Sequence, residues 1–359
     1  MDICFVFNFH CHKYLNQYSF FDIGKNRQYF DSKLSDTTNL KNLTDYQLPL
    51  LEAIEHLTTK TNLKCSLFFS GVFLEVLSQH HPEMTRRIGK LVDSGKIELL
   101  GGTYYNSLAC LYSHDAFKLD IKKHAKALKS IFNYKANCFT NSENIYSNDI
   151  GRQIKSAGFK STIAPAVEWY LGSNNCHQIF QSDGARKLSL LLADCSISKF
   201  LFDSSRSSTF FMDDSLKNKL VVVQADPLHL PKNMPWNKIL SGIKTRKNQL
   251  LSIEEAVKIH QTKTTYHIPH PLALNCSGLD LSYFIENPIQ KDIFDKLKSL
   301  KNELPSKIDS KLQADQLALS DSRNFLNLST KAISKETTKP HDHYLNMMNM
   351  LTDIEIRVS

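Results

Sequence analysis

The sequence predicts an α/β protein whose parallel strands form a barrel or an open sheet. Short apolar runs recur along the chain, amphipathic helical stretches separate them, and only helical spacing continues after about residue 283. With 359 residues and 42% hydrophobic composition, the chain can bury a large core. We therefore expect a β/α domain over residues 1–282 and a helical region over residues 283–359.

Eight segments are predicted strands because they are short and rich in apolar residues. In chain order they are Ile3–His10, Leu63–Ser70, Ile97–Tyr105, Ala136–Asn141, Ser161–Ala164, Leu188–Ala193, Leu220–Ala225 and Thr264–Ile268. In parallel α/β folds, catalytic side chains gather at the carboxyl ends of the strands, because the loops there vary while the sheet holds their ends. The functional residues are therefore expected at these strand ends.

Helices are predicted where apolar residues recur at three- and four-residue spacing behind a capping residue. The predicted starts are Ser113, Ser147 and Ser252, the last with Glu255 in capping-box spacing. Gly95 and Gly158 follow predicted helix ends. In the C-terminal region, Ile289 to Leu300 and Tyr344 to Leu351 keep helical spacing. These helices are expected to cover the strands.

Composition argues against several classes of partner and compartment. The net charge is +8, but the lysines are spread out and no basic stretch is interleaved with aromatic residues, so we expect no nucleic-acid partner. No run reaches the eighteen or so apolar residues of a membrane span. The eight cysteines are scattered without a CxxC pair, which suits a reducing compartment. The apolar start without a basic leader is read as a core strand, and the protein as cytoplasmic.

Four polar clusters stand at predicted strand ends, and they are Asn8 to His12, Gly101 to Ser107, Asn141 to Tyr146 around Glu143, and Gln224 to His229 around Asp226. Together they offer two carboxylates, histidines and aromatic rings. Glycoside hydrolysis commonly uses a carboxylate pair, and aromatic faces can stack on sugar rings. The spacing alone does not select this chemistry.

Segments along nearly the whole chain resemble, in the same order, blocks of glycoside hydrolase family 57, the group of α-amylases, 4-α-glucanotransferases and glucan-branching enzymes. The resembling segments are Phe7–His10, Phe69–Glu75, Gly95–Leu100, Thr103–Ala109, Phe139–Tyr146, Lys187–Leu192, Leu279–Ser282 and Tyr344–Leu351. The segment Phe139–Tyr146 resembles the block whose glutamate is the catalytic nucleophile. Asp321 matches a further family position without an assigned role.

This resemblance implies an incomplete, seven-stranded β/α barrel with a C-terminal helical bundle packed against its mouth. It implies an enzyme that acts on α-glucans or maltooligosaccharides by double displacement and needs no cofactor. Glu143 would be the nucleophile and Asp226 the general acid/base. The implied substrate-binding residues are His10, Tyr104, Tyr105, Asn106, Trp169 and Asp280.

The sequence also departs from the family pattern at strand ends. After Asp226 it reads Pro227-Leu228-His229 without further carboxylates, and Asn106 stands where the family usually has histidine. Losses at strand ends beside preserved core blocks are typical of a relative with impaired catalysis. The alternative function is therefore a homologue that binds α-glucans or no longer processes them.

Simpler interpretations remain for each candidate residue. Asp226 before Pro227 can begin a turn, Glu143 can be a solvated or salt-bridged carboxylate, and His10 can be a structural histidine. Three histidine pairs have possible ligand spacing, namely His10 with His12, His267 with His270, and His341 with His343. None has a recognisable third ligand in the sequence, so we predict no metal site and reject a metal-dependent deacetylase. The sequence leaves the oligomeric state open.

Overall fold

The computed structural model describes residues 1–61, 63–202, 216–230, 236, 239, 248–260, 264–275, 277–303, 310–331 and 339–358. Its strands are β1 (Asp2–Phe9), β2 (Cys65–Phe69), β3 (Ile97–Leu99), β4 (Cys138–Phe139), β5 (Ser161–Pro165), β6 (Ile179–Ser182), β7 (Ser189–Ala193), β8 (Leu220–Ala225), β9 (Gln249–Leu250) and β10 (Thr265–Tyr266). Each of the eight predicted strands overlaps one of these, and β6 and β9 were not predicted.

Helices alternate with the strands in the first part of the chain and follow one another in the last part. The first group is α1 (Ser32–Asn42), α2 (Leu48–Lys60), α3 (Gly71–His80), α4 (Pro82–Asp93), α5 (His114–Phe132), α6 (Asn148–Ser156), α7 (Glu168–Leu171), α8 (Cys195–Phe202) and α11 (Ile253–Ile259). The second group is α12 (Ser282–Ile285), α13 (Pro288–Glu303), α14 (Ser310–Leu319), α15 (Ser322–Asn327) and α16 (Pro340–Val358). Ser113, Ser147 and Ser252 accept the capping hydrogen bonds that their sequence positions predicted.

Seven parallel strands close into a ring. β8 pairs with β1, β1 with β2, and β2 with β3. An isolated parallel bridge between Gly101 and Phe139 joins β3 to β4, which pairs with β5, and β5 pairs with β7. The ring closes through one residue pair, Ala193 with Val222, between β7 and β8. The fold is thus the expected seven-stranded β/α barrel. Two neighbouring strand pairs in it, β3 with β4 and β7 with β8, are joined by a single residue pair each.

The alternation along the strands separates two layers of core. On β1, Phe5 and Phe7 belong to the large outer core shared with the helices, whereas Cys4 and Val6 belong to a smaller core whose members come mostly from the ring strands. This alternation is the period-two pattern of a strand that has one face inside a barrel. The short helix α11 adds Ile253 and Ala256 to the smaller core.

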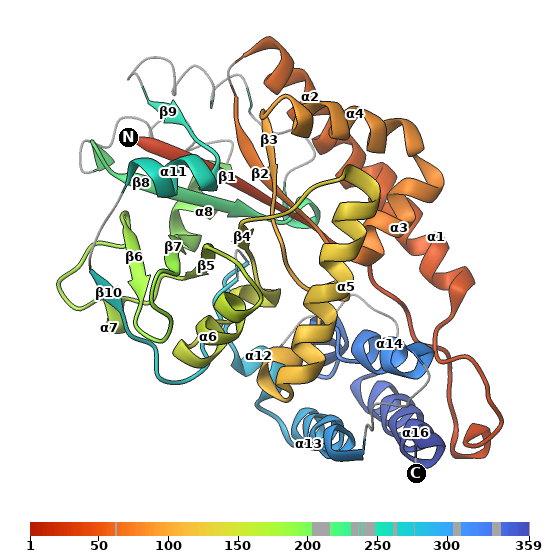
Figure 1. The fold of residues 1–359 in the computed structure, drawn as a ribbon. Coiled ribbons are helices and arrows are strands. Elements are labelled where there is room, and N and C mark those ends of the chain that lie inside the picture. The colour runs from red at the N-terminus through yellow and green to blue at the C-terminus, as the bar shows by residue number, and fades with distance from the viewer. Residues whose placement is uncertain are drawn as a thin grey trace.

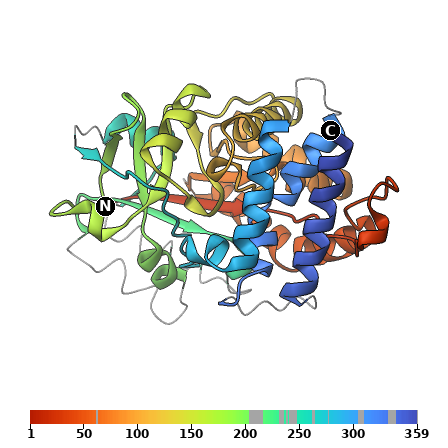
Figure 2. The same cartoon turned by 90° about the horizontal axis from the view of Figure 1, so that it is seen from below.

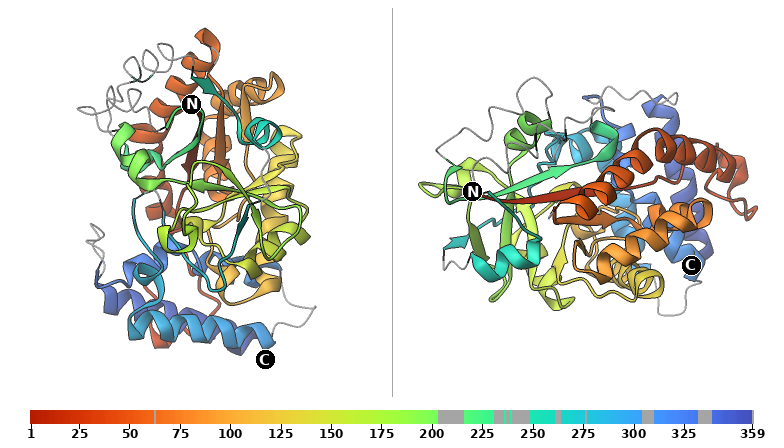
Figure 3. Two further views of the ribbon diagram at one scale, coloured as in Figure 1. Left: turned by 90° about the vertical axis from the view of Figure 1, so that its left-hand side faces the viewer. Right: turned by 90° about the horizontal axis from the view of Figure 1, so that it is seen from above.

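The C-terminal helices form a group at one end of the barrel. Figure 1 shows α13, α14 and α16 below the strands, and α1 to α4 together on another side. Figure 2, seen from below, shows α13 and α16 side by side, and the two pack against each other. Figure 3 shows the same helical group beyond one end of the strands. Within the part of the chain that the structure describes, no helix is long and apolar enough to cross a membrane.

Candidate active site

Glu143 lies directly after β4, in the short 3-10 turn Ser142–Asn144. Its backbone is left-handed, with φ 54° and ψ 21°, and Asn144 also has positive φ. The Asn141 side chain closes the turn by donating from Nδ2 to the Ile145 carbonyl at 2.8 Å. A non-glycine residue in this conformation carries strain of roughly 1–2 kcal/mol, which surrounding contacts must offset.

Two side chains from distant parts of the sequence hold the Glu143 carboxylate. Asn275 Nδ2 donates to Oε2 at 2.5 Å, and Ser322 Oγ donates to Oε1 at 2.7 Å. Asn106 Nδ2 in turn donates to Ser322 Oγ at 2.9 Å. Each carboxylate oxygen therefore has its own donor, which fixes the orientation of the group.

The loop after β3 binds the segment that carries Ser322. Leu108 N donates to the Ser320 carbonyl at 2.8 Å, and Ser322 N donates to the Asn106 carbonyl at 3.1 Å. These backbone bonds attach the start of α15 to the barrel loop. The expected site residue Asn106 thus contacts Glu143 through Ser322.

Asp226 follows β8 and caps the turn Pro227–His229. Its Oδ1 accepts from Leu228 N at 2.8 Å, its Oδ2 lies 3.8 Å from His229 Nδ1, and its side chain is 29% exposed. The turn-forming interpretation of Asp226 is therefore confirmed. The side chain remains partly exposed, and no backbone N–H donates to Oδ2 among the hydrogen bonds of the described residues.

Two links connect the β8 end with the turn that carries Glu143. Gln224 and Asn144 exchange a pair of amide hydrogen bonds at 2.6 and 3.0 Å. His229 Nδ1 lies 2.8 Å from Ser277 Oγ, and Ser277 N donates to Asn275 Oδ1 at 3.0 Å. The turn after β8 is thereby joined to the residue that holds Glu143.

His10 follows β1 and contacts a buried carboxylate. Its Nε2 lies 3.0 Å from Asp321 Oδ2, and its Nδ1 lies 2.9 Å from Ser70 Oγ. His12 Nδ1 reaches the same Oδ2 at 2.7 Å. Burial alone would raise the pKa of Asp321, but His10 and His12 together bring it below its ordinary value. Asp321 is thus a third side chain of a metal-ligand type beside His10 and His12. The sequence did not reveal it as their partner, because it lies 311 positions from His10.

The four other expected substrate-binding residues lie at different depths. Tyr104 and Tyr105 are buried and in edge contact, with ring centroids 4.9 Å apart and Lys123 Nζ 4.4 Å from both. Trp169 lies on α7 and is 88% exposed. Asp280 is exposed, and its Oδ1 accepts from Ser282 N and Oγ. None of the four is among the described residues that hydrogen-bond Glu143.

Sequence reasoning missed Asn275 and Ser322 as partners of Glu143. They lie 132 and 179 positions from it, in segments without a motif that predicts the contact. The only signal was indirect: Ser322 directly follows Asp321, which matches a family position, and Asn275 lies four residues before the resembling segment Leu279–Ser282.

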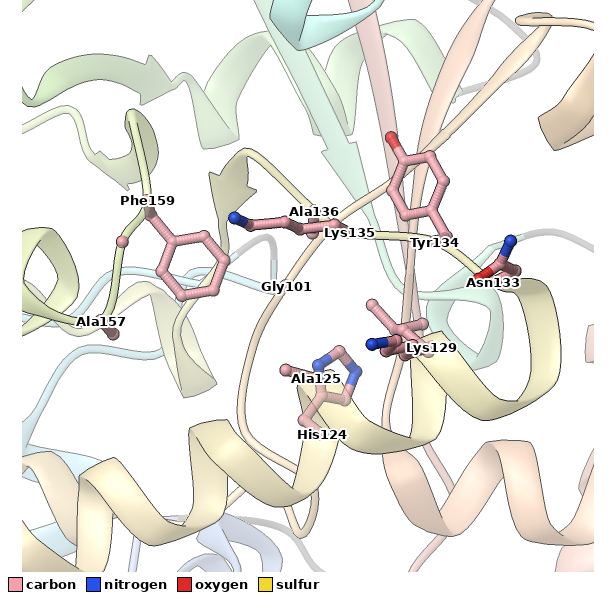
Figure 4. A pocket seen from close by; sticks show the side chains of 12 residues that line it. Gly101, His124, Ala125, Lys129, Asn133, Tyr134, Lys135, Ala136, Ala157 and Phe159 are labelled. Atoms are coloured by element: carbon pink, nitrogen blue, oxygen red, sulfur yellow. The ribbon is translucent and has the colours of Figure 1, made fainter.

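A separate cavity of about 390 Å³ lies between α5 and the loop that precedes β4. Figure 4 shows His124 and Lys129 of α5 beside Tyr134, with Phe159 at the other side. His124 is structural here, because Gly102 N donates to its Nδ1 and its Nε2 lies 2.7 Å from the Phe69 carbonyl. Burial lowers the pKa of His124 to about 4, so the ring stays neutral. None of the predicted site residues lines this cavity.

The fold and the site define a β/α-barrel protein with an oriented carboxylate at its strand ends. The model of glycosyl hydrolase family 57 matches residues 5–218, and the chain belongs to this family. A curated relative from Methanocaldococcus jannaschii, named "Putative alpha-amylase", is 32% identical over 164 residues. That match covers 45% of this chain and 35% of the relative, so the chain spans only about a third of it.

Several solved structures share the fold over almost the whole chain. The branching enzyme of Pyrococcus horikoshii has a TM-score of 0.74 at 10% identity, covering 98% of this chain and 88% of its own. The branching enzyme of Thermococcus kodakaraensis, solved with glucose, has a TM-score of 0.71 at 10% identity, with coverages of 99% and 90%. An α-amylase of Thermotoga maritima has a TM-score of 0.68 at 8% identity, with coverages of 100% and 93%.

Proposed function

We propose that this protein is an α-glucan-active glycoside hydrolase or glucanotransferase that works by retaining double displacement. Glu143 is the nucleophile, and Asp226 is the general acid/base. The observation that carries the proposal is the Glu143 carboxylate, held by Asn275 and Ser322 at the carboxyl end of β4. Its left-handed backbone supports the same role, because strain of this kind collects at functional sites.

In this mechanism Glu143 attacks the anomeric carbon of the sugar while Asp226 gives a proton to the leaving oxygen. A covalent glycosyl-enzyme forms, and water or a sugar hydroxyl then displaces Glu143 with Asp226 acting as base. Both steps invert the anomeric carbon, so the overall configuration is retained. The hydrogen bonds from Asn275 and Ser322 hold the Glu143 carboxylate in one orientation for its attack on the anomeric carbon.

The second candidate is a family member that binds α-glucans without turnover. The hydrogen bond from Leu228 N to Asp226 Oδ1 favours this candidate, because that oxygen already accepts the hydrogen bond that holds the turn and is not free to carry the catalytic proton. A barrel with an intact Glu143 but no proton donor would form no glycosyl-enzyme from ordinary glucans. Binding could persist, because it needs only the sugar contacts.

The test is sugar release or transfer from maltoheptaose and glycogen by the purified protein, with Glu143→Gln as the matched variant. This change removes the nucleophile and keeps the shape, while the Ser322 hydroxyl can turn to accept from the new amide. We expect activity in the native protein and a loss of at least about 10³-fold in the variant. If both proteins are folded and equally inactive, the glucan-binding candidate replaces the enzyme.

A further inference from the structure

His10, His12 and Asp321 converge although they come from two ends of the chain. The two histidines follow β1, and Asp321 is the N-cap of α15. One ligand atom from each of the three side chains lies within 4.8 Å of the other two. We propose that these three side chains bind one divalent transition-metal ion of the zinc class. The proposal concerns metal binding and does not rest on the glucan activity.

The geometry of the three atoms suits a shared ion. Both ring nitrogens approach the same carboxylate oxygen, at 3.0 and 2.7 Å. Ligands about 2.0–2.1 Å from a tetrahedral zinc are roughly 3.3 Å apart, so each ring nitrogen would move a few tenths of an ångström away from Oδ2 when the ion enters. Two imidazoles and one carboxylate also form a known ligand set for zinc and for Fe²⁺.

Outer contacts hold each of these ligands in place, as in established metal sites. His10 Nδ1 contacts Ser70 Oγ at 2.9 Å, which orients the ring toward Asp321. Asp321 Oδ1 accepts from Arg323 N at 3.0 Å, which leaves Oδ2 facing the histidines. The His12 ring packs edge-on against Tyr14, with centroids 5.0 Å apart.

Two buried amides fix the backbone of the histidine loop. Asn39 accepts from His12 N at 3.2 Å and donates to the His12 carbonyl at 2.8 Å. Gln47 Nε2 donates to the His10 carbonyl at 2.9 Å. Both amides are almost fully buried. A loop held this firmly presents its histidines in one arrangement, which lowers the entropic cost of binding an ion.

The site would also connect the barrel with the C-terminal helices. Asp321 precedes Ser322, whose hydroxyl holds Glu143, so an ion at Asp321 would fix the start of α15 beside the carboxylate. The side chains of His12 and Asp321 are 3% and 4% exposed, and that of His10 is 16% exposed. A water molecule as fourth ligand would therefore enter from the His10 side.

The experiment is a calorimetric titration of Zn²⁺ into chelator-treated full-length protein. The variants are His12→Ala and Asp321→Asn, and the second keeps an N-cap acceptor for α15. His177→Ala is the matched control, because Cys176, His177 and Asp194 form the other cluster of ligand-type residues in the described chain. Circular dichroism of all proteins without metal verifies that each is folded.

We expect one equivalent of Zn²⁺ in the native protein and in His177→Ala, with affinity at least about 100-fold weaker in the other two variants. Bound Co²⁺ should give visible absorption in the native protein, a readout that needs no variant. The proposal is overturned if the native protein binds neither ion, if Asp321→Asn binds zinc like the native protein, or if only His177→Ala loses it.

Discussion

At the residue scale, Glu143 combines a strained backbone with a carboxylate that accepts a side-chain hydrogen bond at each oxygen. Its φ of 54° would cost roughly 1–2 kcal/mol without compensation. Hydrogen bonds from Asn275 and Ser322 and the Asn141 amide that closes the turn offset this cost. The carboxylate is thus held by two partly buried hydrogen bonds, which distinguishes Glu143 from a solvated surface glutamate.

At the same scale, Asp226→Ala separates the proposed acid/base role of Asp226 from its observed role in capping the turn. As an acid/base, its loss should slow maltoheptaose turnover by about 10²–10⁴-fold, because the sugar leaving group needs a proton. An aryl α-glucoside, whose leaving group departs without protonation, should lose much less in the first step. The measurement is the initial rate on both substrates.

Asp226→Asn serves as the control for the turn, because Asn accepts the hydrogen bond from Leu228 N that Asp226 now accepts. It should keep the stability of the native protein and lose activity like Asp226→Ala. Equal losses on both substrates in Asp226→Ala, with full activity in Asp226→Asn, would show that the residue only shapes the turn.

At the element scale, the strands and helix starts were predictable because local patterns determine them. A buried strand is recognisable from a short apolar run, and a helix start from a capping residue and the turn after it. The helix starts at Ser113, Ser147 and Ser252 were predicted in this way. The predicted strand Ile97–Tyr105 is regular only to Leu99 and pairs once more at Gly101, and the residues after it form the loop that binds Ser320 and Ser322. The strands β6 and β9 are short and carry no comparable signal.

The partners of Glu143 were not predictable, because they depend on how distant elements meet. Asn275 and Ser322 reach it only after the barrel has closed and α15 has attached to the loop after β3. Asp321 likewise joins His10 across almost the entire chain. Sequence patterns indicated which strand ends carry polar residues, and the tertiary structure decided which of those residues touch.

The capping box of α11 yields a prediction at this scale. Ser252 Oγ accepts from Glu255 N, and Ser252 N donates to Glu255 Oε2. Ser252→Ala should lower the free energy of unfolding by about 1 kcal/mol and leave turnover unchanged, because α11 contributes no residue to the Glu143 site. Urea unfolding measures the first quantity. Ser252→Thr, which can still cap, should remain near native, and an equal loss in both variants would contradict this explanation.

At the scale of the whole molecule, two buried acids inside the protein affect its stability. Burial raises the pKa of Glu98 on β3 to about 7, and burial also raises the pKa of Asp120 on α5 to about 7. Glu98 Oε2 accepts from Ser66 Oγ at 2.8 Å, while Asp120 accepts from the Ser107 hydroxyl at 2.6 Å. Both groups keep their proton in the folded state at a pH where the unfolded chain has released it.

Stability should therefore fall as the pH rises from about 4.5 to about 7. In this window Glu98 and Asp120 bind more protons in the folded state than in the unfolded state, so each lowers the free energy of unfolding by up to about 1.4 kcal/mol per pH unit. His124 acts in the opposite direction below about pH 6.5, because burial lowers its pKa to about 4, and offsets one of the two acids there. Glu98→Gln and Asp120→Asn remove the charge and should flatten the slope. Urea unfolding at several pH values measures it, and an unchanged slope in the double variant would contradict the assignment.

The most direct test of the central claim is covalent trapping of the native protein with a fluorinated α-glucosyl fluoride, followed by mass spectrometry of its peptides. A retaining enzyme with Glu143 as nucleophile should gain one glycosyl group on the peptide that contains Glu143, and Glu143→Gln should remain unlabelled. A glycosyl group on another carboxylate, or products with inverted anomeric configuration, would contradict the proposed mechanism.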